Sequence, residues 1–146
     1  MKRLIYSNFK NQYTDLGLLL IRIIIGLEMG FYGLDKMMHF SENSIDKFWN
    51  EEVNFLGMGG TITISLVIFS ELFCSFFILI GFLTRLSLIP LIITVLYILF
   101  LDNFKIISVE EGSLGINAGF KFLIFYVILM LSGPGKYSLD HRFFKI

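Results

Sequence analysis

Residues 16–33 read LGLLLIRIIIGLEMGFYG, an apolar run that is interrupted by two charged residues, Arg22 and Glu28. A helix needs roughly 20 apolar residues to cross the hydrocarbon core of a bilayer, and fewer where charged or aromatic ends reach the interface. An ionised side chain at mid-bilayer costs about 2.5 to 3.5 kcal/mol, so such a charge persists where it is paired, hydrated or functional. The run therefore predicts a membrane helix that buries functional or paired charges.

Three more apolar runs follow this one, over residues 57–81, 86–101 and 116–132. Of the 146 residues, 55% are hydrophobic and only 16% are charged, and the mean hydropathy is +0.76, which is typical of an integral membrane protein. The runs are continuous, whereas barrel strands would alternate between apolar and polar residues. The sequence thus predicts an all-α protein in which residues 1–146 form one four-helix transmembrane bundle of up-down topology.

The distribution of Lys and Arg predicts the orientation in the membrane. The two tails and the turn at residues 82–85 carry seven Lys and Arg residues, and the opposite side carries three, one of which is Lys36. Because short cytoplasmic segments are enriched in Lys and Arg, both termini are expected in the cytoplasm and the chain in the bacterial inner membrane. The formal net charge is zero, so no basic surface remains that would favour a nucleic-acid partner.

Four charged residues in the runs form two predicted pairs. If the midpoint of each run lies at the bilayer centre, Arg22 and Glu71 have nearly equal depth on the cytoplasmic side, and Glu28 and Lys121 match on the other side. An attraction of about 4 kcal/mol at 4 Å does not offset the roughly 5 to 7 kcal/mol needed to insert two charges. Arg22 and Glu71 are therefore interpreted as a ligand, proton or redox site, with helix register as the alternative. Glu28 and Lys121 are interpreted as a secondary, structural pair.

The sequence contains few residues that could bind a metal ion or a haem iron. His39 and His141 are expected on opposite sides of the membrane, which disfavours haem ligation by both within one chain. Cys74 is the single cysteine, so it cannot cycle through an internal disulfide, and it is interpreted as a core residue. We expect neither a metal site nor a covalently held cofactor.

A lipophilic ligand between the helices is compatible with the composition. Such a site combines an apolar body with a few polar groups that orient the ligand. In the predicted bundle, Arg22 would donate to a quinone oxygen, Glu71 would exchange a proton, and Tyr97 and Tyr126 would line the pocket. The alternative for the tyrosines is core or lipid-facing filler.

The C-terminal tail contains a second group of notable residues. Gly133, Pro134 and Gly135 should end the fourth helix abruptly, because proline cannot continue the helix and glycine accepts a left-handed cap. Arg85, in the turn between the second and third spans, is predicted to pair with Asp140. This pair would fix the tail to the membrane face, or alternatively form a docking surface for a soluble partner.

These motifs resemble the DoxX family of small four-helix bacterial membrane proteins. The resemblance rests on the first span with Arg22, on Glu71 followed by GFLTR at residues 81–85, and on GPGKYSLD at residues 133–140, and it covers residues 16–140. It implies a membrane subunit of quinone-dependent sulfur oxidation, such as a thiosulfate:quinone oxidoreductase, or of a redox-stress complex. The positions to which it extends are Arg22, Glu71, Arg85, Gly133, Pro134, Gly135, Ser138 and Asp140.

Three functional hypotheses remain open, and none assigns a catalytic residue. The favoured one is a membrane subunit of a quinone-linked oxidoreductase whose electron donor is handled by a protein partner. The second is a non-catalytic scaffold for soluble redox proteins. The third is a small transporter or proton pathway gated by Arg22 and Glu71. In each case the chain is expected to contact lipid and to associate with a partner or with copies of itself.

Overall fold

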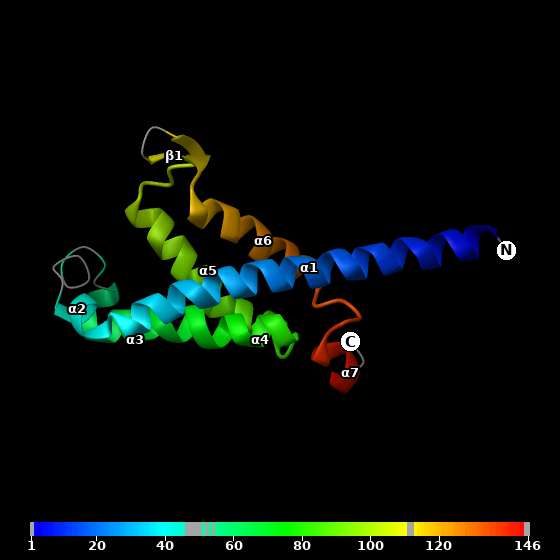
Figure 1. Ribbon diagram of the computed structural model, residues 1–146, viewed down its shortest axis with the longest axis horizontal. Helices are drawn as coiled ribbons and strands as arrows, with labels where there is room; N and C mark the ends of the chain where they lie inside the picture. Colours follow the sequence, from blue (N-terminus) through cyan, green and yellow to red (C-terminus); the bar gives the residue numbers. More distant parts are fainter. Residues whose placement is uncertain (1, 46–50, 52, 54, 111–112, 145–146) are drawn as a thin grey trace.

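Four long helical segments carry the apolar runs in a computed structural model that describes residues 2–45, 51, 53, 55–110 and 113–144 (Figure 1). The second segment is continuous but contains a π-helix, η3, in its middle. The long segments are α1 (Lys2–Met38), α3 to α4 (Gly60–Ile68, η3 Phe69–Cys74, Ser75–Ile80), α5 (Thr84–Leu101) and α6 (Ala118–Ser132). The short elements are α2 (Phe40–Ile45), η2 (Phe55–Gly57), β1 (Ile107–Glu110), β2 (Ser113–Ile116) and α7 (Leu139–Phe144).

The first helix is longer than the apolar run from which it was predicted. The run ends at Gly33, but α1 continues to Met38, and the part suited to cross a membrane is Tyr13–Met38. Gly33 lies inside the helix, where its missing side chain allows close packing against η3. Lys36, which the sequence placed in a loop, therefore lies in the last turn of α1.

Within the described residues, three helices are long and apolar enough to span a bilayer: Tyr13–Met38, Gly60–Ile80 and Thr84–Leu101. The chain is therefore a multi-pass membrane protein. The fourth apolar helix, α6, has 15 residues and begins at Ala118, two residues later than predicted, because the chain at residues 113–116 is extended. At 1.5 Å per residue, α6 is about 22 Å long, which is shorter than a typical hydrocarbon core.

A two-stranded hairpin, which the all-helical prediction did not include, connects α5 to α6. Strands β1 and β2 are antiparallel, with Ile107 opposite Ile116. The Asn117 side chain then accepts a hydrogen bond from the Gly119 backbone N–H at 2.9 Å and donates one to Asp102 at 2.7 Å. Asn117 thus caps the start of α6 and ties it to the end of α5.

The long helices pack around a shared apolar interior. In Figure 1, α3 and α4 run alongside α1, and α1 also contacts α6, while α5 contacts α6, η3 and α4. Because lipid tails are as apolar as leucine, close packing between the helices favours association more than water exclusion does. The buried cluster comprises Leu18, Ile25, Met29, Cys74, Ile78, Leu88, Leu91, Val95, Leu99, Phe122, Tyr126 and Leu129.

The end of α6 agrees with the prediction from its glycines. The helix ends at Ser132, and Gly133 follows with φ 79°, in the region that glycine tolerates best. The chain then returns to α4, where the Asp140 N–H donates to the Gly81 carbonyl at 2.8 Å. Figure 1 shows α7 near this end of α4, while the N-terminal part of α1 projects beyond the other helices.

Candidate functional site

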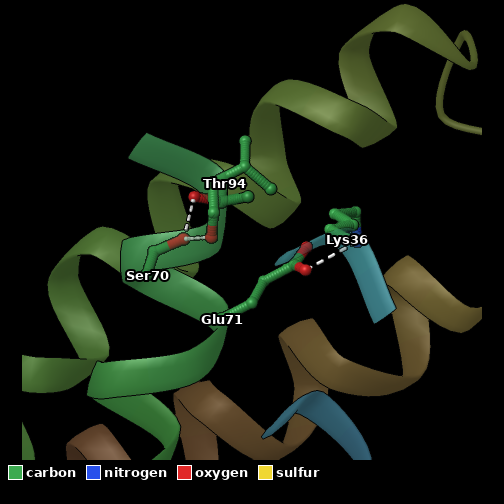
Figure 2. Close-up of polar contacts among 5 residues, drawn as sticks. Lys36, Ser70, Glu71 and Thr94 are labelled. Carbon is green, nitrogen blue, oxygen red and sulfur yellow. Dashed lines mark hydrogen bonds and ion pairs between the residues drawn. The ribbon is translucent and has the colours of Figure 1, made fainter. Parts of the chain in front are cut away.

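An ion pair inside the helical bundle joins α1 to η3. Lys36 Nζ donates to Glu71 Oε2 at 2.6 Å, and the Glu71 side chain is 2% exposed whereas that of Lys36 is 22% exposed. Figure 2 shows the two side chains meeting from their separate helices. The buried carboxylate is therefore neutralised by a lysine that sequence reasoning had assigned to a loop.

The π-helix and a glycine position this pair. Glu71 lies within η3, and π-helical turns of this kind are frequent at functional sites. A Cβ atom on Gly33 would lie 2.8 Å from the backbone nitrogen of Leu72 and 3.0 Å from the carbonyl carbon of Glu71. Since only glycine allows that approach, Gly33 sets α1 directly against the widened turn that carries Glu71.

The predicted contact between Arg22 and Glu71 is wrong. Both side chains are buried and described, yet Glu71 binds Lys36 and Arg22 binds the far end of the bundle. Arg22 lies fourteen residues before Lys36, which is about 21 Å along a helix. The midpoint of the first apolar run does not give the register of α1, because the helix continues past that run to Met38.

Arg22 is fully buried where α1 meets the C-terminal segment. Its Nη2 donates to the Tyr137 carbonyl at 2.6 Å, while Nε and Nη1 have no hydrogen-bond partner. Gly81, at φ 69°, leaves the space that Arg22 occupies, because a Cβ atom there would lie 2.0 Å from Nη1. The carboxylate of Asp140 interacts favourably with the guanidinium across this junction.

Asp140 caps α5 rather than pairing with Arg85. Its two carboxylate oxygens accept from the backbone N–H groups of Leu83 at 2.6 Å and Thr84 at 2.8 Å, at the first turn of the helix. The predicted Arg85–Asp140 ion pair does not form between these described residues, and Arg85 instead lies beside Gly133.

Two other members of the C-terminal motif shape the same segment. Ser138 Oγ donates to the Gly135 carbonyl at 2.7 Å and accepts from the His141 N–H at 3.1 Å. Gly135 adopts φ 75°, and Pro134 lies between the two glycines. The motif thus holds the segment in place by local hydrogen bonds, which supports the tail-fixing interpretation of this group.

The second predicted ion pair is present. Lys121 Nζ donates to Glu28 Oε1, and the two side chains are 40% and 34% exposed, so the pair is more accessible than predicted. Lys121 also lies over the Phe122 ring, 4.9 Å from its centroid. The pair links α1 to α6.

Tyr126 belongs to the buried core. Its side chain is fully buried, its ring stacks on Phe122 with a centroid distance of 6.0 Å, and its hydroxyl has no hydrogen-bond partner. A buried hydroxyl without a partner is costly and uncommon, so it calls for an explanation.

A cavity of about 270 Å³ lies between α3, η3 and α5. Of the four residues predicted to form a ligand site, only Tyr97 is part of its lining. Leu66, Phe69 and Ile93 line it and are also exposed on the outside of the helices, so the cavity is open toward the surrounding lipid. Its lining comprises Val53, Phe55, Thr63, Leu66, Val67, Phe69, Ser70, Pro90, Ile93, Thr94, Tyr97 and Ile98.

Two hydroxyl groups lie together in the mostly apolar lining of this cavity. Ser70 and Thr94 lie 2.9 Å apart, and each also reaches a backbone carbonyl at 2.9 Å, Ser70 that of Val67 and Thr94 that of Pro90. Two hydroxyl hydrogens cannot satisfy three hydrogen bonds at once. Because hydroxyl bonds to helical carbonyls add little stability, either group can turn to a ligand oxygen at small cost.

Ser70 and Glu71 connect the cavity to the ion pair. They are consecutive residues of η3, and Figure 2 shows Ser70 directed toward Thr94 and Glu71 toward Lys36. Sequence reasoning missed Lys36, Ser70 and Thr94. Two features of the sequence could have indicated some of these residues. Lys36 lies three residues after Gly33, and the hydroxyl of Ser70 lies next to the buried acid Glu71.

Comparison with known proteins places the chain in a family. The DoxX family matches residues 17–102, which is more than half of the chain. A protein of Mycobacterium tuberculosis, whose name states only that it is an uncharacterized membrane protein, is 27% identical over 140 residues, covering 86% of this chain and 80% of the relative. No solved structure matches. On the family match, the chain belongs to the DoxX family.

Proposed function

We propose that this protein is the membrane subunit of a quinone-linked redox system and that it binds the quinone ring in the cavity between α3, η3 and α5. The cavity itself is the observation that carries the proposal. It is apolar and open to lipid, and at about 270 Å³ it is close to the smaller ligand sites of proteins.

The residues in the cavity suit a neutral ring with carbonyl oxygens. Ser70 and Thr94 offer a hydroxyl hydrogen to such an oxygen, and Tyr97, held edge-to-face against Phe55 at 5.1 Å, provides an aromatic wall. The mouth near Leu66, Phe69 and Ile93 would let a long apolar tail remain among the lipids. No charged side chain lines the cavity among the described residues, which favours a neutral ligand.

The neighbouring ion pair supports a role in proton transfer. A bound quinone supplies the capacity to accept electrons and protons. Glu71, next to Ser70 in η3, can hold a proton close to the cavity, and Lys36 keeps the carboxylate oriented while it is ionised. With neither haem nor metal ligands predicted, the electrons would come from a protein partner.

Native mass spectrometry of protein gently extracted from its own membrane tests this assignment. Thr94→Leu should abolish quinone retention, because it removes a hydroxyl and fills the cavity. Thr61→Leu makes the same chemical change on the exposed face of α3 and should retain quinone. Equal retention in both variants would refute the cavity assignment, and recovery of a soluble redox partner without quinone in the wild type would favour the scaffold hypothesis.

We further propose that all four long helices cross the membrane in up-down order with both termini in the cytoplasm. The excess of Lys and Arg in the tails supports this orientation. In a Cys74→Ser background, a membrane-impermeant thiol reagent should label Ser108→Cys in intact cells and Ser7→Cys only after permeabilisation. Labelling of Ser7→Cys in intact cells would contradict the orientation.

A further inference from the structure

The hairpin formed by β1 and β2 has one apolar face. Its register pairs apolar residues at alternate positions, Ile107 with Ile116 and Val109 with Leu114. The pair between them, Ser108 with Gly115, lies on the opposite face, because successive residues of a strand point to opposite faces. Ile107 and Ile116 are 62% and 69% exposed, so the described parts of the chain leave most of their surface uncovered.

The base of the hairpin is held at the end of a helix that can span the membrane. Thr84–Leu101 is about 27 Å long at 1.5 Å per residue, close to the thickness of a hydrocarbon core. Asp102 follows this span directly, and its carboxylate accepts from the Asn117 side chain at 2.7 Å. The Asn117 N–H donates to the Ile106 carbonyl at 2.9 Å. The hairpin therefore begins where the hydrocarbon ends.

Exposed apolar residues connect the outer side of α5 to the hairpin. Phe100, in the last turn of α5, and Phe104 are both exposed, and their rings meet edge-to-face at 6.4 Å. Phe104 has φ 53°, a backbone conformation that is uncommon for a residue with a side chain. It lies three residues before Ile107, so their Cα atoms are at most about 11 Å apart. The surface that α5 presents to lipid therefore continues to the base of the hairpin.

The position and the shape of the hairpin suit the interface between hydrocarbon and water. Figure 1 shows it at the ends of α5 and α6, away from α3 and α4. A two-stranded hairpin alone is marginally stable in water, so a surface that covers its apolar face would stabilise it. Its outer strand edges carry backbone groups without ladder partners, which excludes the hydrocarbon but suits the hydrated headgroup region. One apolar and one polar face are typical of segments that lie in this region.

We propose that the β1–β2 hairpin lies in the membrane interface, with Ile107 and Ile116 directed toward the acyl chains and the Gly115 face directed toward water. Its partner is the lipid of the leaflet at this end of α5. Because Asn117 caps α6 and binds Asp102, the hairpin also fixes the depth at which α6 begins. The inference does not depend on quinone binding, so it and the proposed function can fail separately.

Spin-label accessibility in reconstituted vesicles tests this position. Full-length Cys74→Ser protein with one nitroxide-labelled cysteine is placed in vesicles of phosphatidylethanolamine and phosphatidylglycerol. Oxygen, which concentrates in lipid, and a nickel chelate, which stays in water, serve as the two relaxation agents. A label at Ile107→Cys or Ile116→Cys should respond more to oxygen than to nickel. Gly115→Cys is the matched control on the opposite face, where an added Cβ atom meets nothing within 4 Å, and it should respond more to nickel.

A second substitution tests whether apolar contact with lipid is the cause. With the label at Ile116→Cys, Ile107→Ser should lower the ratio of oxygen to nickel relaxation, whereas Gly115→Ser adds a hydroxyl to the polar face and should leave the ratio unchanged. Equal nickel access at residues 115 and 116 would overturn the proposal in favour of a hairpin in water. Exclusion of both agents from residue 116 would also overturn it, because protein would then cover the isoleucines, and spectral broadening between labels would identify that protein as a second copy of the chain.

Discussion

At the scale of single residues, the central feature is the lysine that compensates one buried carboxylate, that of Glu71. Lys36 serves Glu71 better than an arginine deep in the same helix could. The Lys36 side chain is 22% exposed, so its charge is less desolvated than that of a fully buried side chain. The ion pair thus compensates the charge that Glu71 would otherwise carry alone inside the bundle.

Removal of Lys36 should leave Glu71 as an uncompensated buried charge. We expect Lys36→Met to destabilise the protein by about 3 kcal/mol, the lower range for breaking a buried pair, because Lys36 is partly exposed. The double variant Lys36→Met with Glu71→Gln should recover most of the loss. Thermal unfolding in detergent measures both effects, and a double variant as unstable as the single one would show that the charge is not the cause.

The sequence predicted which charged residues lie inside membrane helices better than it predicted the partner of each one. Arg22, Glu28 and Glu71 lie in membrane helices, and the Glu28–Lys121 contact was predicted correctly. The Arg22–Glu71 contact failed because it depended on which part of α1 faces Glu71. The close approach of Gly33 to η3 sets that register, and it is a tertiary contact that no apolar run reveals.

At the scale of elements, the π-helix is the feature that organises the site. It places Ser70 against α5 and Glu71 against α1 within two consecutive residues. The four helical segments could be predicted from hydropathy, but the π-turn and the hairpin could not. A π-turn changes the hydrogen bonding of the backbone without a distinctive side-chain pattern, and the hairpin strands are only four residues long.

Two glycines of α1 test the packing of this element. Gly33→Ala should cost about 1 to 3 kcal/mol, because the new methyl group meets the backbone of η3, which cannot move aside. Gly30→Ala meets nothing within 4 Å and should be neutral or stabilising by up to about 1 kcal/mol through helix propensity. Thermal unfolding compares the two variants. Equal melting temperatures would mean that α1 does not approach η3 as described.

At the scale of the whole molecule, the C-terminal segment links three helices. Asp140 caps α5, Tyr137 accepts from Arg22 of α1, and the Asp140 N–H binds the end of α4 through Gly81. The sequence identified most of these residues but not their contacts, because a buried carboxylate can bind backbone N–H groups as readily as an arginine.

Asp140→Asn should loosen this junction. The amide retains one acceptor but loses the charge that faces Arg22, so we expect a loss of about 1 to 3 kcal/mol. Cleavage by trypsin after Lys136 should also become faster. Asp15→Asn, which weakens the more exposed contact with Lys136, should cost less than about 1 kcal/mol. Similar effects of the two substitutions on stability and cleavage would contradict a special role for Asp140.

The central claim is that the cavity between α3, η3 and α5 holds a quinone, and photocrosslinking in native membranes tests it most directly. A photoreactive quinone analogue should label peptides from residues 60–80 and 84–101, and Thr94→Leu should remove that labelling while Thr61→Leu leaves it intact. Labelling confined to a second groove, which lies between α1 and the η3–α4 segment and is lined by Gly30, Leu72 and Phe76, or labelling unaffected by Thr94→Leu, would contradict the account.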